Sequence, residues 1–135
     1  MRRVDENAWY DPDLNTWIKR EGNYILVGLS DWAQNVIGKV SSIYNLPRLH
    51  SSLTQNMMLC DIESDKTVTE VIIPISGEII SLNNSLLTNV NWVNESCYDK
   101  GWFVTVIPCD LTQLDQMLSP EQYKAAIDSF FRKSS

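Results

Sequence analysis

The stretch Glu63-Ser64-Asp65-Lys66-Thr67-Val68-Thr69-Glu70-Val71-Ile72-Ile73-Pro74-Ile75-Ser76-Gly77-Glu78 carries most of the fold information in this sequence of 135 residues. Four polar residues, 64–67, separate two strand-forming segments, 57–63 and 68–73. Short polar residues tolerate the left-handed backbone that tight turns often need, so this pattern predicts a β-hairpin with Lys66 at its tip. The alternation of apolar residues in the first segment predicts one inward face, formed by Met58, Cys60 and Ile62.

Further strands are predicted on both sides of this hairpin. Residues 16–20 and 23–29 are rich in β-branched and aromatic side chains, and Glu21-Gly22 between them indicates a second hairpin. Ser30 is a good N-cap for a short helix over 31–37, which Gly38 would end. Strands are also expected over residues 40–44, 78–82 and 101–107, with one helical turn within 86–93.

Helices are expected at the end of the chain. Apolar residues have helical spacing over 111–118, and Ser119-Pro120-Glu121-Gln122 is a capping box with proline at the first helical position. A helix should therefore run from this box to about Phe131. The first 14 residues are polar and contain the turn signal Tyr10-Asp11-Pro12-Asp13, so regular structure is expected only after them.

Together these elements predict a mainly β fold. We expect a small flattened antiparallel barrel or sandwich with one short internal helix and C-terminal helices. The length fits one compact domain. We divide it into an N-terminal extension (1–14), a β domain (15–108) and a C-terminal helical segment (109–135) that packs on the same domain.

The balance of charge limits the class of partner. The chain has 11 Lys and Arg against 17 Asp and Glu, a net charge of -6, which disfavours nucleic acid and anionic membrane surfaces and favours a protein with a basic rim. No apolar run approaches the roughly 20 residues that span a bilayer, and the polar residues after Met1-Arg2-Arg3 argue against a secretory signal. We therefore expect a cytoplasmic protein. Acidic residues near the hairpin tip would form a docking face: Asp61, Glu63, Asp65 and Glu70.

Residues that could catalyse a reaction are few. One histidine, His50, and three cysteines without a Cys-x-x-Cys spacing indicate neither a metal site nor a disulfide framework. A nucleophile at Cys60 or Cys109 would need a base, and only His50 is available among the histidines. An enzyme is therefore disfavoured. An interaction module without a cofactor would fit the composition, but it would leave the surroundings of Lys66 unexplained.

The hairpin resembles the lipoyl-attachment hairpin, in which the ε-amine of a lysine carries lipoic acid in amide linkage. Glu63, Ser64 and Asp65 precede Lys66, and Glu70 follows it. The resemblance implies that these four residues form a frame for recognition by a lipoate ligase or lipoyl transferase. Lipoyl domains of 2-oxo-acid dehydrogenase acyltransferases share this frame, whereas biotin carriers place their lysine between two methionines.

The rest of the chain resembles glycine cleavage system H proteins, in register from about Trp17 to Tyr123. The resemblance rests on Tyr24-Ile25-Leu26-Val27-Gly28-Leu29-Ser30-Asp31-Trp32-Ala33-Gln34, Ile37-Gly38, Pro74-Ile75-Ser76-Gly77-Glu78, Gly101-Trp102 and Leu118-Ser119-Pro120-Glu121-Gln122-Tyr123. It implies a lipoyl-domain-like hammerhead fold and a carrier rather than an enzyme. The arm on Lys66 would shuttle an aminomethyl group between glycine decarboxylase, aminomethyltransferase and dihydrolipoamide dehydrogenase, in the cytoplasm or, for a eukaryotic chain, the mitochondrial matrix.

Two positions depart from the family pattern. The family usually has a glutamate in the first strand that is thought to hold the amine of the loaded arm, and this chain has Thr16 there. A hydroxyl pairs with an ammonium less strongly than a carboxylate does. This change, together with the Tyr10-Asp11-Pro12 segment before it, also resembles H-like lipoate-binding proteins of a heterodisulfide-reductase-like sulfur oxidation system, so sulfur is an alternative cargo. Cys97 replaces a common proline, and we interpret it as a buried spacer.

Overall fold

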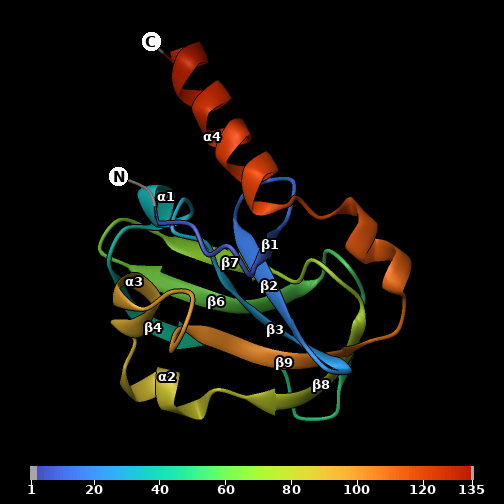
Figure 1. The fold of residues 1–135 in the computed structure, drawn as a ribbon. Coiled ribbons are helices and arrows are strands. Elements are labelled where there is room, and N and C mark those ends of the chain that lie inside the picture. The colour runs from blue at the N-terminus through green and yellow to red at the C-terminus, as the bar shows by residue number, and fades with distance from the viewer. Residues whose placement is uncertain (1–2, 135) are drawn as a thin grey trace.

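The computed structural model describes residues 3–134 and consists of two antiparallel sheets with a few helices (Figure 1). The larger sheet has the strand order β1 (Trp9–Tyr10), β2 (Thr16–Glu21), β3 (Tyr24–Leu29), β9 (Trp102–Pro108), β8 (Gly77–Leu82) and β5 (Ser52–Leu53). The smaller sheet has the order β4 (Val40–Tyr44), β6 (Met58–Ser64) and β7 (Val68–Ile72). Over the described residues the sheets do not close into a barrel, so the open form of the predicted mainly β fold is confirmed.

The main core lies between the two sheets. Ile25 and Val27 of β3 and Val104 of β9 meet Cys60 and Ile62 of β6 in one cluster of buried side chains. Removing this apolar surface from water is the main favourable contribution to folding. Residues 103–106 of β9 are all buried, so both faces of the larger sheet are covered there and its sequence does not alternate.

The central hairpin of β6 and β7 forms as predicted, except at its beginning. Glu63 lies opposite Val68, next to the turn. Between Met58 and Cys60 the register shifts by a bulge, which buries Leu59 and leaves Met58 39% exposed. The predicted inward face therefore keeps Cys60 but loses Met58.

Three short helices lie between strands, where one helix and one helical turn were expected: α1 (Gln34–Ile37), α2 (Asn84–Thr88) and α3 (Trp92–Glu95). The helix predicted over 31–37 is shorter than expected. Ser30 does cap the turn that precedes this helix, because Ser30 Oγ accepts a hydrogen bond from the Ala33 N–H at 3.2 Å. Residues 31–33, however, form a turn, and the α-helix begins only at Gln34.

A second, smaller core joins the two ends of the chain. We call it the aromatic cluster, and it contains Ala8, Tyr10, Leu14, Trp17, Tyr123 and Ile127. In β1, Tyr10 pairs with Trp17 of β2, so the prediction that regular structure begins only after residue 14 is wrong. A two-residue strand gives too short a pattern to recognise, and burial of Tyr10 against distant residues stabilises it. The domain boundaries at 14 and 108 stay predictions.

The C-terminal helix α4 (Pro120–Ser134) starts at the predicted capping box. Ser119 Oγ accepts a hydrogen bond from the Gln122 N–H at 3.2 Å, and the Ser119 N–H donates to Gln122 Oε1 at 2.8 Å. The segment before it forms a 3-10 helix (Leu111–Gln116). Figure 1 shows α4 leading away from the sheets, so its first turns make the contacts with the aromatic cluster.

Candidate functional site

Lys66 lies at the tip of the β6–β7 hairpin, and its side chain is exposed. The Ser64 N–H donates to the Thr67 carbonyl at 2.9 Å, which closes the turn around Asp65 and Lys66. The structure thus places the lysine where the sequence predicted it. Solvent, and therefore a modifying enzyme, can reach its amine.

The side chain of Ser64 fixes the backbone of the tip. Its Oγ accepts hydrogen bonds from the N–H groups of Lys66 and Thr67, each at 3.2 Å, and donates to the Thr67 carbonyl at 3.1 Å. Hydroxyl residues stabilise tight turns in this way, by bonding to backbone groups a few residues along the chain. Ser64 therefore holds Lys66 in a defined orientation.

Asp65 attaches the tip to the end of α1. Its N–H donates to the Lys39 carbonyl at 3.1 Å, and its Oδ1 accepts from the Lys39 N–H at 3.1 Å. Gly38, which lies between the end of α1 and Lys39 in the sequence, has a φ of +80°. A Cβ at Gly38 would lie 2.6 Å from Asp65 Oδ1 and 3.1 Å from Lys66 Cδ, so the stem of the lysine passes directly over this glycine.

Gly38 is thus a residue of the site that we expected only as a helix terminator. The other two residues of the predicted frame, Glu63 and Glu70, lie on β6 and β7 with exposed side chains. Ser64 and Asp65 therefore act on the tip directly, whereas Glu63 and Glu70 face solvent beside it.

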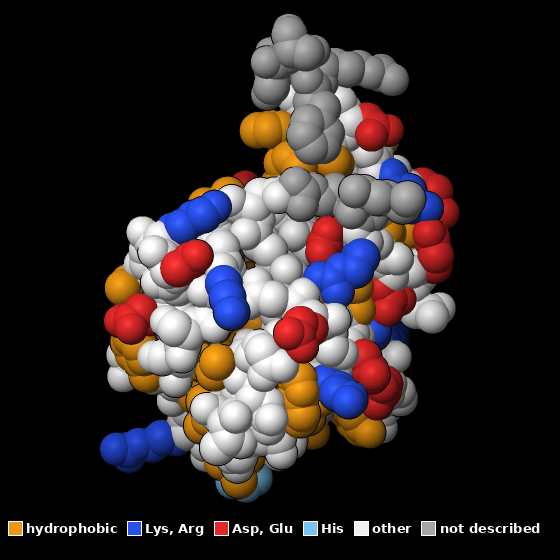
Figure 2. All heavy atoms as spheres, turned by 90° about the vertical axis from the view of Figure 1, so that its left-hand side faces the viewer, with side chains coloured by type: hydrophobic (Ala, Val, Ile, Leu, Met, Phe, Trp, Pro, Cys, Tyr) orange, Lys and Arg blue, Asp and Glu red, His pale blue; other side chains and the backbone are white. Residues whose placement is uncertain are grey.

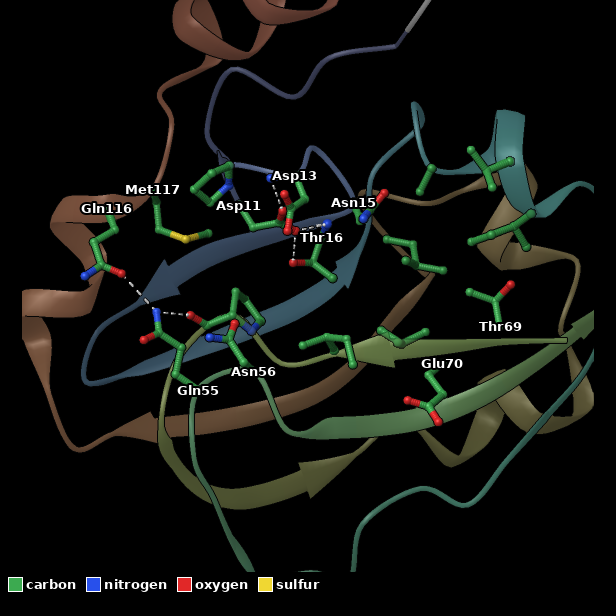
Figure 3. A pocket seen from close by; sticks show the side chains of 18 residues that line it. Asp11, Asp13, Asn15, Thr16, Gln55, Asn56, Thr69, Glu70, Gln116 and Met117 are labelled. Carbon is green, nitrogen blue, oxygen red and sulfur yellow. Dashed lines mark hydrogen bonds between the residues drawn. The ribbon is translucent and has the colours of Figure 1, made fainter.

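A groove of about 240 Å³ begins next to the tip and follows β7 (Figure 3). Thr69, near the tip, and Gln55 and Gln116 lie at opposite ends of it (Figure 3), and Ile37, the neighbour of Gly38, also lines it. At about 3.3 Å per residue, the part along β7 from Thr69 to Ile72 is about 10 Å long. Its walls include apolar side chains of both sheets and of α1, so it suits a slender, mostly apolar chain.

The opposite wall of the groove contains Asp11 and Thr16, at the two ends of the loop between β1 and β2 (Figure 3). Thr16 is 2% exposed, and both its N–H and its Oγ1 donate to Asp11 Oδ2 at 2.5 Å. The Asp13 N–H donates to Asp11 Oδ1 at 2.7 Å. The sequence predicts a turn at Asp11 and includes this residue in the resemblance to H-like lipoate-binding proteins, but no local pattern shows that the turn borders a groove.

The groove has a one-sided charge. The acidic residues Asp11, Asp13 and Glu70 line it, and among the described residues that line it there is no Lys or Arg. A cationic group in the groove would therefore be attracted, whereas an anionic group would be repelled.

Two of the three cysteines, Cys60 and Cys97, are poor candidates for nucleophiles. Burial, together with the nearby Asp61 carboxylate, raises the pKa of the Cys60 thiol to about 12. Burial also raises the pKa of Cys97, whose carbonyl accepts a hydrogen bond from Trp17 Nε1 at 2.9 Å. Cys97 is thus buried, as expected of a spacer, while Cys109 is exposed. Because thiolates rather than thiols attack substrates, Cys60 is inert at neutral pH.

The only histidine of the sequence, His50, lies at the surface of the protein. His50 is exposed, and its Nδ1 lies 3.2 Å from Glu78 Oε2. In residues 3–134, no group of three or more His, Cys, Asp or Glu side chains could hold a metal ion. No helix in the same range is both long and apolar enough to cross a membrane.

The side of the molecule that carries α1 and α3 has charges of both signs. Figure 2 shows Lys and Arg side chains interspersed there with Asp and Glu. Near the tip, Glu63, Asp65 and Glu70 are exposed, whereas Asp61 is partly buried and accepts a hydrogen bond from Asn45 Nδ2 at 2.7 Å. An acidic docking face at the tip stays a prediction.

Comparisons with known proteins agree with this geometry. The family model described as glycine cleavage H-protein matches residues 9–130. The chain is 39% identical over 112 residues to a glycine cleavage system H protein of Anoxybacillus flavithermus, covering 83% of this chain and 87% of the relative. A protein of the same description from Geobacillus thermodenitrificans is 38% identical with the same coverage.

A solved structure has the same fold. The crystal structure of a glycine cleavage system H protein from Mycobacterium marinum matches with a TM-score of 0.81 and 22% identity, covering 93% of this chain and 99% of the other. The match to the family model extends over nearly all of the described chain, including the hairpin, α1 and the groove. The chain therefore belongs to the glycine cleavage H-protein family.

Proposed function

We propose that this protein is a carrier whose Lys66 is joined by an amide bond to lipoic acid. The observation that supports this most strongly is the exposed Lys66 on a hairpin turn held by Ser64 and Asp65, beside a groove. An exposed tip lets an attached arm reach the active sites of several enzymes in turn. The protein supplies attachment and orientation and leaves the reaction to the cofactor and the partner enzymes.

The residues around Lys66 fit a lipoyl group. The lack of a side chain at Gly38 leaves room for the lysine stem, and the groove that starts beside it has apolar walls. Acylation would remove the charge of the amine, so the arm could lie against these walls without desolvating an ammonium. When bound, the group supplies a dithiolane that can be reduced and can accept a transferred carbon or sulfur group.

We infer that the cargo is an aminomethyl group, carried between glycine decarboxylase, aminomethyltransferase and dihydrolipoamide dehydrogenase. The one-sided charge of the groove supports this, because an aminomethyl group ends in an ammonium at neutral pH. The alternative cargo, sulfur, brings no ammonium into the groove, so the acidic lining would offer it no such attraction. Charge therefore favours the glycine cleavage function over sulfur oxidation.

The test is co-expression with a lipoate ligase and intact mass spectrometry. We expect the wild type to gain the mass of one lipoyl group and Lys66→Arg to gain none. Lys124→Arg, at an exposed lysine of α4, serves as the matched control and should be modified like the wild type. An unmodified wild type, or a modified Lys66→Arg variant, would refute the carrier function.

The cargo is tested with the lipoylated protein. We expect glycine decarboxylase to release carbon dioxide from glycine with the lipoylated wild type and not with the unlipoylated chain. Turnover with a sulfur-oxidising complex but not with glycine decarboxylase would instead establish the alternative cargo.

A further inference from the structure

The groove beside Lys66 contains one carboxylate that is held far more firmly than the others. Asp11 lies in the loop between β1 and β2, and its own N–H donates to the Thr16 carbonyl at 3.0 Å. Its side chain accepts three further hydrogen bonds, two from Thr16 and one from the Asp13 N–H. The hydrogen bonds of Asp11 therefore hold the two ends of the β1–β2 loop together.

The Asp11 carboxylate keeps room for another donor. A carboxylate has about four acceptor positions. Among the described residues, the two Thr16 donors occupy Oδ2 and the Asp13 N–H occupies one position on Oδ1. One position on Oδ1 remains for a donor that enters the groove.

The other two carboxylates of the groove are less suited to bind a cation tightly. Asp13 and Glu70 have exposed side chains, where water screens their charge, whereas Asp11 is partly buried. A hydrogen bond between a carboxylate and an ammonium is about twice as strong as one between neutral groups, and less so in water. Asp11 is thus the site in the groove where an ammonium would gain most.

Thr16 takes part by holding Asp11 rather than by contacting the cargo itself. Its hydroxyl is committed to Asp11 Oδ2, and the residue is 2% exposed. A glutamate at position 16 would bring a second carboxylate into this nearly buried position beside Asp11, where like charges repel. The sequence has Thr16 where the family usually has a glutamate. In the structure, Asp11, which directly follows β1, places a carboxylate next to Thr16.

On the basis of the proposed function, we propose that Asp11, positioned by Thr16, binds the terminal ammonium of an aminomethyl-loaded arm in the groove. The arm extends from Lys66 over Gly38, past Thr69 and along β7, and its apolar part lies against the walls. The contact retains the loaded arm and shields it from water. Asp11 is a binding residue for the cargo, and Thr16 is a positioning residue.

The experiment compares carriers whose lipoylation and aminomethyl loading have both been verified by mass. We measure the rate at which ammonia is released from the loaded protein in buffer, without any partner enzyme. Loss of a charge-assisted hydrogen bond should speed the release in Asp11→Asn by about tenfold or more. Thr16→Val, which keeps the carboxylate but removes the hydroxyl that orients it, should release ammonia at an intermediate rate.

Two further variants serve as controls. Asp128→Asn makes the same chemical change at an exposed position of α4 and should release ammonia like the wild type. The double variant Asp11→Asn with Thr16→Glu moves the carboxylate across to position 16, without the repulsion that Thr16→Glu alone would cause. It should recover slow release, which also shows that faster release in Asp11→Asn does not come from misfolding.

A second measurement does not depend on release. In wild type, loading should shift the amide resonance of Thr16 in an NMR spectrum, since this N–H donates to Asp11 Oδ2, and should raise the melting temperature. Both changes should be absent in Asp11→Asn. If Asp11→Asn is loaded normally, releases ammonia at the wild-type rate and shows the same melting shift, the assignment of Asp11 is overturned. Failure of the wild type to become lipoylated or loaded would instead refute the proposed function.

Discussion

The hairpin tip and the aromatic cluster are built in opposite ways. At the tip, residues close in sequence bond to one another, and Ser64 and Thr67 are three positions apart. In the aromatic cluster, the rings of Tyr10 and Tyr123 stack at 3.8 Å between their centroids although they lie at opposite ends of the chain. The tip is exposed and the cluster is buried. The hairpin tip is therefore held by a few local hydrogen bonds, whereas the aromatic cluster depends on packing between residues far apart in the sequence.

The groove connects these two regions. Tyr10 and Trp17 of the aromatic cluster are the immediate neighbours of Asp11 and Thr16 in the sequence. Burial of the two rings fixes the ends of the loop that contains the proposed ammonium site. The cluster thus positions the loop that carries Asp11, and the tip positions Lys66, to which we propose that the arm is attached.

Removing the aromatic stack should have the largest effect on stability. It should also show that the stability of the aromatic cluster and the lipoylation of the hairpin tip are independent. Tyr123→Ala deletes a fully buried ring, and we expect the free energy of unfolding to fall by about 3–5 kcal/mol. Urea unfolding followed by circular dichroism measures this change. Lipoylation of Lys66 should continue at the wild-type rate at temperatures where the variant is folded.

The matched control for this variant is Tyr44→Ala, which removes a ring that is 37% exposed on β4. It should cost clearly less stability than Tyr123→Ala. Equal losses in the two variants, or loss of lipoylation in a fully folded Tyr123→Ala, would contradict the separation of the tip from the cluster.

A substitution at Gly38 should act mainly on the tip. Its φ of +80° and ψ of -157° lie in a region that is essentially restricted to glycine, so Gly38→Ala should cost about 1–3 kcal/mol of stability. The new Cβ would also displace Asp65 and the stem of Lys66, and we expect slower lipoylation. Time courses of lipoylation by mass spectrometry, with melting curves, measure both effects.

Gly22→Ala separates these two causes. Gly22 also has a positive φ, +61°, but a Cβ there would meet no atom within 4 Å. This variant should lose some stability and keep the wild-type rate of lipoylation. If Gly22→Ala slows lipoylation as much as Gly38→Ala does, the contact between Gly38 and the tip has no role in presenting the lysine.

The sequence predicted the hairpin tip well because its structure depends on nearby residues. Residues 64–67 form the turn, and the capping box at Ser119 starts α4, since both use bonds between residues two or three apart. In contrast, β1 was not predicted, because Tyr10 is held by a bridge to Leu118 and by stacking on Tyr123, far away in the sequence. The bulge after Met58 was not predicted either, since the alternating pattern of residues gives no sign of it. Asp11 was missed as a groove residue because only the fold brings it into the same groove as residues of β7 and α1.

Alkaline pH should destabilise the buried side of this comparison gradually. Burial raises the pKa of Cys60 from 9.0 to about 12, and it also raises the pKa values of Tyr10, Tyr98 and Tyr123 in and beside the aromatic cluster. The folded state therefore keeps protons that the unfolded state loses, so stability is fully present below the ordinary pKa values and falls as pH rises.

For Cys60 alone, the loss between about pH 9 and pH 12 should be about 1 kcal/mol per pH unit. Melting curves recorded across this range measure the slope. Cys60→Ala should be less stable than the wild type at neutral pH, because it leaves a cavity, but its stability should fall less steeply above pH 9. Cys109→Ala, which removes an exposed thiol, should keep the wild-type slope. An unchanged slope in Cys60→Ala would mean that the core between the two sheets does not shield this thiol from water. The contrast between the buried core and the exposed hairpin tip would then be weaker than the packing indicates.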